Sequence, residues 1–416
     1  MRKTFMKKLT KLELKWICYD IGNSAFILLV STILPIYFNS LSSAAGVAES
    51  DYLSYWSYAT SISTIIVALL GPILGTIADY KGRKKRVFLT SALLGALALA
   101  CFWIPSYWFS FLVLYIAAKI CYSLSLVFYD SMLVDITTEQ NMDSVSSQGY
   151  AYGYIGSCIP FVISLVFVLL YDKLGITMHT AMMIAFLINA GWWIAFTLPL
   201  AKAYRQKHYI EPQRHVVVDT FSRLKKTLSS IRKERKVFLF LLSFFFFIDG
   251  VYTIIDLATA YGTSLGLDTT GLLLALLFTQ IVAFPASLTF ASLSKRYDTA
   301  RLIKICIAAY FLIALFAIQL DKLWEFWLLA GAVGCFQGGI QALSRSYYAK
   351  IIPENASGEY FGLFDICGKG ASFLGLLVVG LVTQYTGHQN IGVAALTFMF
   401  IIGYVLFSKA AKLDND

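Results

Sequence analysis

The sequence predicts an all-α integral membrane protein, and three observations carry that prediction. Of its 416 residues, 58% are hydrophobic and only 14% are charged, whereas a soluble globular domain has about 25% charged residues. The mean hydropathy is +0.69. The apolar residues form continuous runs of membrane length, not the alternating pattern of a transmembrane barrel. A water-soluble enzyme does not fit this composition, and helices are the expected spanning elements.

The apolar runs predict twelve transmembrane helices in two sets of six. The first set covers residues 17–39, 55–78, 87–104, 107–131, 149–171 and 178–198, and the second covers 237–260, 271–293, 302–319, 324–349, 360–383 and 390–408. The longest polar segment lies between the two sets. We therefore expect an N-terminal six-helix half (1–198), a cytoplasmic linker (199–236) and a C-terminal six-helix half (237–416).

The linker contains a predicted amphipathic helix over Asp219–Lys236, with Asp219 as its N-cap. Its apolar positions recur at helical spacing and its other face is basic; the residues are Phe221, Leu224, Leu228 and Ile231, opposite Arg223, Lys225, Lys226 and Arg232. Such a face suits the anionic headgroups of membrane lipids. A solvated helix that merely links the two halves is the alternative.

The basic residues are distributed unevenly along the chain. The formal net charge is +10, and Lys and Arg concentrate in Met1–Lys15, Lys81–Arg86, Lys202–Lys236 and Lys295–Lys304, whereas the loops on the other side hold only Lys173 and Lys322. Positive loops mark the cytoplasmic side, so both termini are expected in the cytoplasm. The basic clusters sit at span ends with no aromatic-rich groove between them, which argues against a nucleic-acid partner.

Residues for a cofactor or metal site are missing from the sequence pattern. The seven cysteines are dispersed in apolar spans without metal-ligand spacing, and the four histidines lie in or near loops. There is no Gly-rich phosphate-binding loop, so ATP-driven pumping is not expected. Asp249 and Asp365 resemble an intramembrane protease pair only in residue type, since the Gly-rich companion motif is missing. We therefore expect no enzyme activity, no metal and no cofactor.

Several spans carry polar side chains at membrane depth. An ionised side chain at the bilayer centre costs about 2.5–3.5 kcal/mol, so a group of them indicates a polar cavity. These residues share helix faces within their spans: Asp20 and Asn23; Lys119, Tyr122 and Asp130; Asp249 and Asp256; Gln337, Gln341 and Arg345; and Asp365 and Lys369. The alternative is that they form fixed ion pairs, such as Asp365 with Lys369, that hold helices together.

The turn after the second span is the most specific local signal. It runs from Gly71 to Arg86 and contains Gly75, Ala78, Asp79, Gly82 and Arg83. This spacing resembles the Gly-x3-Ala-Asp-x2-Gly-Arg-Lys signature of the major facilitator superfamily. The resemblance implies the major facilitator fold, in which spans 1, 4, 7 and 10 line a central cavity.

The same resemblance assigns the turn to a cytoplasmic gate. Asp79 and Arg83 would latch the two halves together, while Gly75 and Gly82 would permit close backbone approach. The alternative is a topology anchor with an ordinary helix cap. The matching turn of the second half, 294–298, lacks the aspartate and the glycine, so a second latch is not expected there.

Four further segments are similar to one branch of the superfamily, the fungal vacuolar amino-acid effluxers and their bacterial members. They are Tyr19–Phe26, Phe247–Val251, Gly339–Ser346 and Tyr360–Lys369. The chain departs from the branch at Ile21, where a tryptophan is common, and at Ile248, where an asparagine often stands. The resemblance implies secondary transport in a bacterial cytoplasmic (inner) membrane, and it does not name the solute.

The function expected from the sequence is secondary active transport of a small solute by alternating access, with an amino acid or a similar polar molecule as the solute. Protons are the expected coupling ion and Na+ the alternative. Asp249 is the leading titrating group, followed by Asp256, Lys119 and Asp130. The competing functions are a lipid or glycolipid flippase, a drug exporter and a membrane receptor without transport. A monomer is expected.

Overall fold

The computed structural model describes residues 9–47, 49–211, 216–231, 233–264 and 266–413. Within these ranges the protein is all-helical, apart from one isolated bridge between Tyr80 and Ile210. The helices are α1 (Lys11–Ala44), α2 (Glu49–Ala78), α3 (Lys84–Ala100), α4 (Trp108–Ser131), α5 (Leu133–Ile136), η1 (Glu139–Asn141), α6 (Met142–Leu169), α7 (Met178–Ala203), α8 (Val216–Ile231), α9 (Arg235–Ser264), α10 (Thr269–Leu293), α11 (Thr299–Ala317), α12 (Leu323–Ile351), η2 (Glu354–Ala356), α13 (Ser357–Thr386) and α14 (Gln389–Lys412).

The long helices confirm an all-helical membrane protein. In the described part of the chain, ten of them are long and apolar enough to cross a membrane. Two helices of the bundle lie outside that set: α3, which has 17 residues, and α13, in which only Leu374–Thr386 is an apolar stretch. A bilayer core about 30 Å thick requires roughly 20 residues of straight helix.

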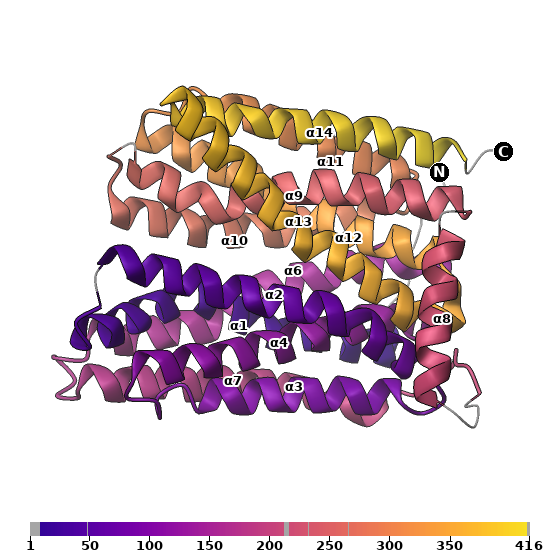
Figure 1. The fold of residues 1–416 in the computed structure, drawn as a ribbon, viewed down its shortest axis with the longest axis horizontal. Helices are drawn as coiled ribbons and strands as arrows, with labels where there is room; N and C mark the ends of the chain where they lie inside the picture. The colour runs from indigo at the N-terminus through magenta and orange to yellow at the C-terminus, as the bar shows by residue number, and fades with distance from the viewer. Residues whose placement is uncertain (1–8, 48, 212–215, 232, 265, 414–416) are drawn as a thin grey trace.

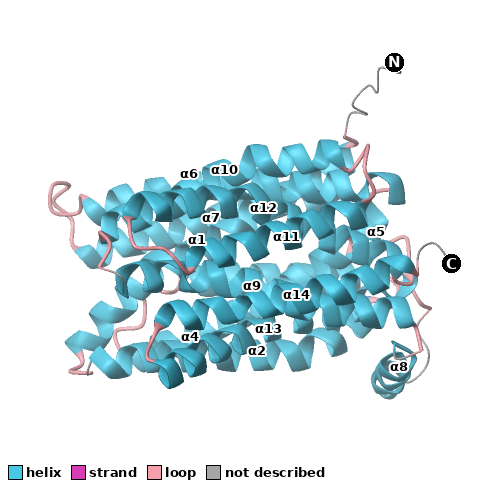
Figure 2. Ribbon diagram, turned by 90° about the horizontal axis from the view of Figure 1, so that it is seen from above, coloured by secondary structure: helices cyan, strands magenta, loops and turns pink. Residues whose placement is uncertain are grey.

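The long helices run side by side in two groups (Figure 1). The N-terminal group contains α1–α7 and the C-terminal group contains α9–α14. Helix α8 lies across the others at one end of the molecule, which we call the α8 end, and Figure 2 shows it there at the edge of the bundle. Both chain termini are at this end (Figure 1). The other end of the molecule is called the opposite end.

Helix α8 lies where an amphipathic helix is predicted, but its start differs from the prediction. It begins at Val216, so Asp219 lies inside the helix and is not its N-cap. The basic face is only partly directed to solvent. Arg223 turns toward the bundle and contacts Glu359 of α13, whereas Lys226 is exposed. The side chains of Phe221 and Lys225 lie outside the described residues.

Several helices extend beyond the apolar runs at the α8 end. Helix α6 begins at Met142, seven residues before the predicted run, and α1 begins at Lys11 behind a capping box formed by Thr10 and Glu13. The added turns are polar, and their side chains bond to other helices; for example, Asp143 accepts three hydrogen bonds. Apolar periodicity therefore detects the membrane core of these helices and misses their polar ends.

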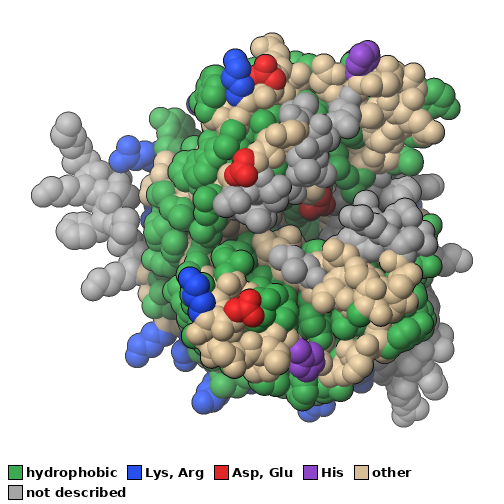
Figure 3. Space-filling model, turned by 90° about the vertical axis from the view of Figure 1, so that its left-hand side faces the viewer, with side chains coloured by type: hydrophobic (Ala, Val, Ile, Leu, Met, Phe, Trp, Pro, Cys, Tyr) green, Lys and Arg blue, Asp and Glu red, His purple; other side chains and the backbone are tan. Residues whose placement is uncertain are grey.

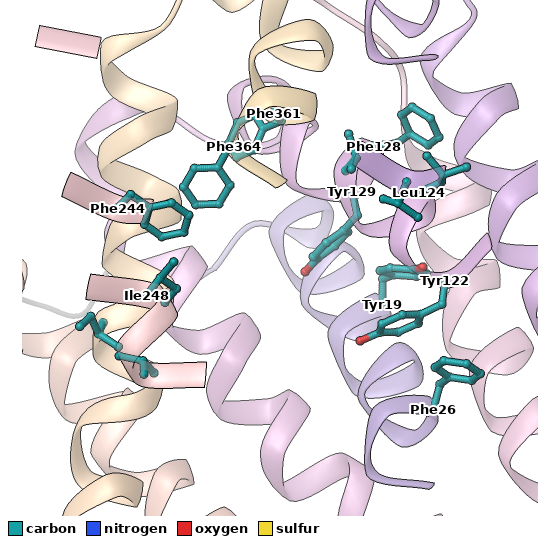
Figure 4. Close-up of a cluster of buried hydrophobic side chains, with 14 of the residues drawn as sticks. Tyr19, Phe26, Tyr122, Leu124, Phe128, Tyr129, Phe244, Ile248, Phe361 and Phe364 are labelled. Carbon is teal, nitrogen blue, oxygen red and sulfur yellow. The ribbon is translucent and has the colours of Figure 1, made fainter. Parts of the chain in front are cut away.

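Each group of helices has its own aromatic core (Figure 4). In the N-terminal group, Tyr122 stacks on Phe26 with ring centroids 4.7 Å apart and also meets Trp193. In the C-terminal group, Phe244 stacks on Phe364 at 4.1 Å. The structure thus places Tyr122, a cavity candidate from the sequence, in the packed interior of one group.

Candidate transport pathway and gate

A buried arginine joins the two groups of helices. Arg345 of α12 is 2% exposed. Its Nη1 atom lies 2.8 Å from Asp130 of α4, and its Nη2 atom lies 3.4 Å from Asp20 of α1. The guanidinium also donates to the side chain and backbone oxygens of Ser146 on α6, at 2.9 and 3.0 Å. One cation of the C-terminal group is therefore enclosed by two carboxylates of the N-terminal group.

Aromatic rings and amide donors complete this ionic cage. The guanidinium lies 4.7 Å from the ring centroid of Trp16 and 4.5 Å from that of Tyr150, within reach of cation–π attraction. Tyr129 donates a 2.8 Å hydrogen bond to Asp20, and the amide of Asn23 lies 3.3 Å from the same carboxylate. Burying charges is favourable only when such partners satisfy them, so the cage holds the charges while the groups are in contact.

The two main partners of the cage each precede a short 3₁₀ helix. Helix η1 follows α4 and α5, and helix η2 follows α12. The offset that relates Glu139, at the start of η1, to Glu354, at the start of η2, also relates Asp130 to Arg345. Asp130 and Arg345 therefore stand at the same distance in the sequence before η1 and η2.

A first lock between the groups forms at Asp79, directly after α2. Its carboxylate accepts hydrogen bonds from the backbone N–H groups of Gly358 (2.8 Å) and Glu359 (2.9 Å). These N–H groups belong to the first turn of α13, where the helix has no acceptors of its own. Lys84 of α3 lies 3.4 Å from the same carboxylate and donates to Ser357 at 2.7 Å. Burial raises the pKa of Asp79, and Lys84 and the two N–H donors oppose that shift.

The predicted gate residues differ in what they contact. Gly75 faces the backbone of Gly358, where a Cβ atom would overlap the carbonyl of the neighbouring helix. Gly82 has a φ of +70°, a conformation that glycine adopts readily. The guanidinium of Arg83 lies 5.9 Å from the Tyr80 ring. The cation beside Asp79 is therefore Lys84, where the superfamily resemblance implied Arg83.

A second lock is present that the sequence did not predict. Asp143, near the start of α6, accepts 2.6 Å hydrogen bonds from Thr299 of α11 and from Ser346 and Lys350 of α12. The acid of this lock comes from α6 and not from the 294–298 turn, which corresponds in the second half to the turn of the first lock. The sequence does place an acidic residue, Asp143, at the start of a polar helix extension. It does not indicate which residues would donate hydrogen bonds to that carboxylate.

Asp249 of α9 is fully buried against α13. One carboxylate oxygen accepts hydrogen bonds from Gly375 N (3.0 Å) and from Thr253 (3.3 Å). The other oxygen is buried without a hydrogen-bond partner among the described atoms. In the part of the chain that the structure describes, no basic side chain lies within salt-bridge distance of this carboxylate.

The remaining charged candidates lie elsewhere on α4, α9 and α13. Asp256 of α9 is exposed, and its charge interacts with that of half-buried Lys119 across the two groups. Lys119 also lies 5.8 Å from the ring centroid of Tyr115. Asp365 is half-buried on α13. The side chain of Lys369 lies outside the described residues, so the predicted Asp365–Lys369 pair is not described.

The glutamines of α12 line the boundary between the groups. Gln341 donates to the hydroxyl of Tyr154 on α6 across a distance of 3.4 Å. Gln337, one turn away, is 4% exposed, and its amide nitrogen has no partner among the described atoms. Among the described residues, no group of three or more metal-ligating side chains is found.

The family model described as "Vacuole effluxer Atg22 like" matches residues 10–142 and 134–412. The chain belongs to this Atg22-like family. It is 41% identical over 408 residues to the "Uncharacterized MFS-type transporter YxiO" of Bacillus subtilis (strain 168), covering 97% of this chain and 95% of that protein. It is 22% identical to "Autophagy-related protein 22" of Coccidioides immitis (strain RS), with 85% and 72% covered.

Solved structures confirm the fold of this Atg22-like chain. The MFS transporter FucP in its outward conformation superposes with a TM-score of 0.73 at 13% identity, covering 96% of this chain and 98% of FucP. The human organic anion transporter MFSD10 gives a TM-score of 0.71 at 14% identity, with 95% and 98% covered. The protein is thus an MFS-type transmembrane transporter and not an enzyme, and its bacterial relative indicates a cell-membrane location.

Proposed function

We propose that this protein is a secondary active transporter that moves a small solute by alternating access. The observation that carries the proposal is the Arg345–Asp130 ion pair, which joins the two groups of helices inside the bundle. Twelve spans, including α3 and α13, form two halves (1–198 and 237–416) joined by the linker at 199–236. A buried pair between halves is strong when formed and broken when the halves separate, which suits a gate that opens and closes.

The arrangement of contacts supports an outward-open conformation. The bonds of Arg345, Asp79 and Asp143 between the groups all lie toward the α8 end. Asp256 is exposed, and Figure 3 shows acidic side-chain atoms recessed at the centre of the opposite end. We take the α8 end as cytoplasmic because the basic segments 81–86 and 202–236 meet there. Both termini are then cytoplasmic.

Proton coupling is supported by the surroundings of Asp249. The carboxyl is buried, has two donors on one oxygen and none on the other, and lies beside no described cation. A carboxyl in such a place is readily held neutral, since burial disfavours its charged form. Its protonation would alter the contact between α9 and α13 and thereby bias the conformation of the C-terminal half.

The solute we propose is an amino acid or a similar small polar molecule. The family description as vacuole effluxers supports export of a small molecule. Lys119 and Asp256 bring charges of both signs to the open side. A lipid or glycolipid flippase and a drug exporter remain the competing outcomes of the test. We propose that the protein acts as a monomer.

The test uses purified protein in a thermal-shift panel of amino acids, short peptides, sugars, nucleosides and lipids at two pH values, followed by uptake into proteoliposomes with an imposed pH gradient. A ligand of the folded state raises its thermal midpoint with concentration. We expect a saturable shift from one polar class, and gradient-driven uptake that Asp249→Asn abolishes. The matched control is Asp321→Asn, because the Asp321 side chain is 69% exposed. Shifts from lipids alone, together with lipid scrambling, would overturn the proposal.

A further inference from the structure

His208 lies in the linker between two carboxylates, one from each group of helices. Its Nδ1 atom is 3.0 Å from Asp135, which is fully buried at the end of the N-terminal group's α5. Its Nε2 atom is 3.0 Å from Glu354 of η2, in the C-terminal group. The imidazole thus bridges the groups at the α8 end, outside the membrane spans and apart from the three contacts described above.

The segment that carries His208 is fixed to the N-terminal group. The backbone N–H groups of Lys207 and His208 donate to Asp135 at 3.1 and 2.9 Å. Gln206 donates to the carbonyl of Ala78 at 3.1 Å, and Ile210 N donates to the carbonyl of Asp79 at 2.9 Å. When the groups separate, His208 therefore stays with Asp135, and its contact with Glu354 is the one that breaks.

The protonation state of the ring decides whether both contacts are favourable. A neutral imidazole has one N–H donor and one acceptor nitrogen, whereas the imidazolium has two donors. Ionised Asp135 and Glu354 only accept, so a neutral ring leaves one nitrogen lone pair against a carboxylate oxygen. Only the charged ring donates to both carboxylates.

Several titratable groups lie around the ring besides the histidine itself. The charged groups in contact with the ring are Asp135 from α5 and Glu354 from η2, and the segment of His208 itself also carries Tyr204, Arg205, Lys207, Tyr209 and Glu211. Tyr204 donates to the second oxygen of Asp135. Burial raises the pKa of Tyr204 well above its ordinary value, with Asp135 adding to the shift, so its hydroxyl remains a donor.

We propose that His208 is a gating residue that closes the cytoplasmic side when it binds a proton, so that cytoplasmic pH sets the balance between the closed and open gate. The inference rests on the proposed function only in taking the α8 end as a cytoplasmic gate. Histidine changes charge between about pH 5 and 8. Acidification charges the ring and strengthens the link to Glu354. A rise in pH removes that charge and favours separation of the groups.

The test is hydrogen–deuterium exchange of the full-length protein in detergent at about pH 5.5 and about pH 8, corrected for the pH dependence of intrinsic exchange. No solute is added. We expect residues 352–360 to be about two- to fivefold less protected at the higher pH, the range for a partly exposed ion pair. His208→Gln should remove this difference, and His208→Arg should keep the protected state at both values.

Two further variants separate this role from a loss of folding. Glu354→Gln changes a side chain that is 57% exposed and removes only the anion of the C-terminal group, so it should also abolish the pH difference. His179→Gln, at the opposite end, should retain it. An unchanged pH difference in Glu354→Gln, or no difference in the wild type, would overturn the proposal. Failure of transport in proteoliposomes with an intact pH difference would instead count against the proposed function alone.

Discussion

The two locks at the α8 end differ in how their acids are held. In the first, Asp79 binds backbone N–H groups of Gly358 and Glu359, and the donors are part of helix α13 itself. In the second, the donors to Asp143 are all side chains, contributed by α11 and α12. Both acids belong to the N-terminal group, and both sets of donors that cross the boundary belong to the C-terminal group.

The two groups of helices are therefore held together by two different kinds of donor, backbone N–H groups in the first lock and side chains in the second. A lock made from a helix N-terminus depends on backbone position, so it needs small residues where the helices cross. Gly75 and Gly358 supply that closeness. A lock made from side chains tolerates a wider crossing but depends on the identity of each donor. Variants that affect one lock and leave the other intact therefore distinguish the two.

The largest effect is expected from Asp79→Ala. The variant removes the acceptor of two N–H groups and leaves Lys84 buried beside no carboxylate, since both side chains are 0% exposed. Removing one partner of a buried ion pair destabilises a protein by about 3–5 kcal/mol. The thermal midpoint of the purified protein, followed by tryptophan fluorescence, should fall accordingly.

The double variant Asp79→Ala with Lys84→Met checks the cause of that loss. It removes the unpaired cation as well, so it should be more stable than Asp79→Ala alone, and the two effects should not add. Additive losses would show that the cation and the acid act separately, and the first lock would then be a pair of unrelated contacts.

Asp143→Asn is expected to have the next largest effect. Asparagine keeps one acceptor oxygen for Thr299 or Ser346 but loses the charge that binds Lys350 at 2.6 Å. Hydrogen bonds to charged groups contribute about 1.5–3 kcal/mol, so the free energy of unfolding should fall by that amount. The control is Asp172→Asn at an exposed site of the opposite end. A loss as large as that of Asp79→Ala would mean that the second lock holds the groups just as firmly.

Gly358→Ala tests the crossing that the first lock requires and the second does not. A Cβ atom at this position would meet the Gly75 carbonyl oxygen at 2.5 Å and Asp79 Oδ1 at 2.8 Å. Overpacking of this kind costs about 1–3 kcal/mol, and hydrogen exchange of the first turn of α13 should become faster. Gly380→Ala lies on the same helix with nothing within 4 Å of the added atom, so it should leave exchange unchanged. Equal effects of both substitutions would contradict the close-crossing argument.

Much of the fold follows from the sequence because membrane helices leave a strong local signal. Each predicted apolar run overlaps a helix, and in the described part of the chain ten of these helices are long and apolar enough to cross the bilayer core. The ends of the helices are predicted less accurately than their apolar cores. Polar turns such as the start of α6 at Met142 are stabilised by contacts with distant helices, and hydropathy carries no trace of those contacts. The start of α8 is predicted wrongly because aspartate is a favoured N-cap residue, whereas Asp219 lies inside the helix, which begins at Val216.

The candidate site was predictable in residue type but not in pairing. The sequence named Asp20, Asp130 and Arg345 as separate polar groups at membrane depth, and the structure joins them into one cage. Pairing depends on how two groups of helices face each other, which one chain's periodicity does not specify. His208 and Asp143 were missed for the same reason, since each becomes recognisable only through partners more than fifty residues away in the chain.

The smallest effect is expected from Arg83→Ala, which distinguishes the two basic residues next to the first lock. The Arg83 guanidinium lies 5.9 Å from the Tyr80 ring and forms no salt bridge among the described residues, whereas Lys84 lies 3.4 Å from Asp79. A cation–π contact at a partly exposed site contributes about 0.5–1 kcal/mol, so the thermal midpoint should change little. Lys84→Met, introduced alone into the wild-type protein, should lower the thermal midpoint clearly, because Asp79 then loses its nearest cation. If Arg83→Ala lowered the thermal midpoint more than Lys84→Met, then Arg83 would be the latch residue, as the superfamily resemblance implies.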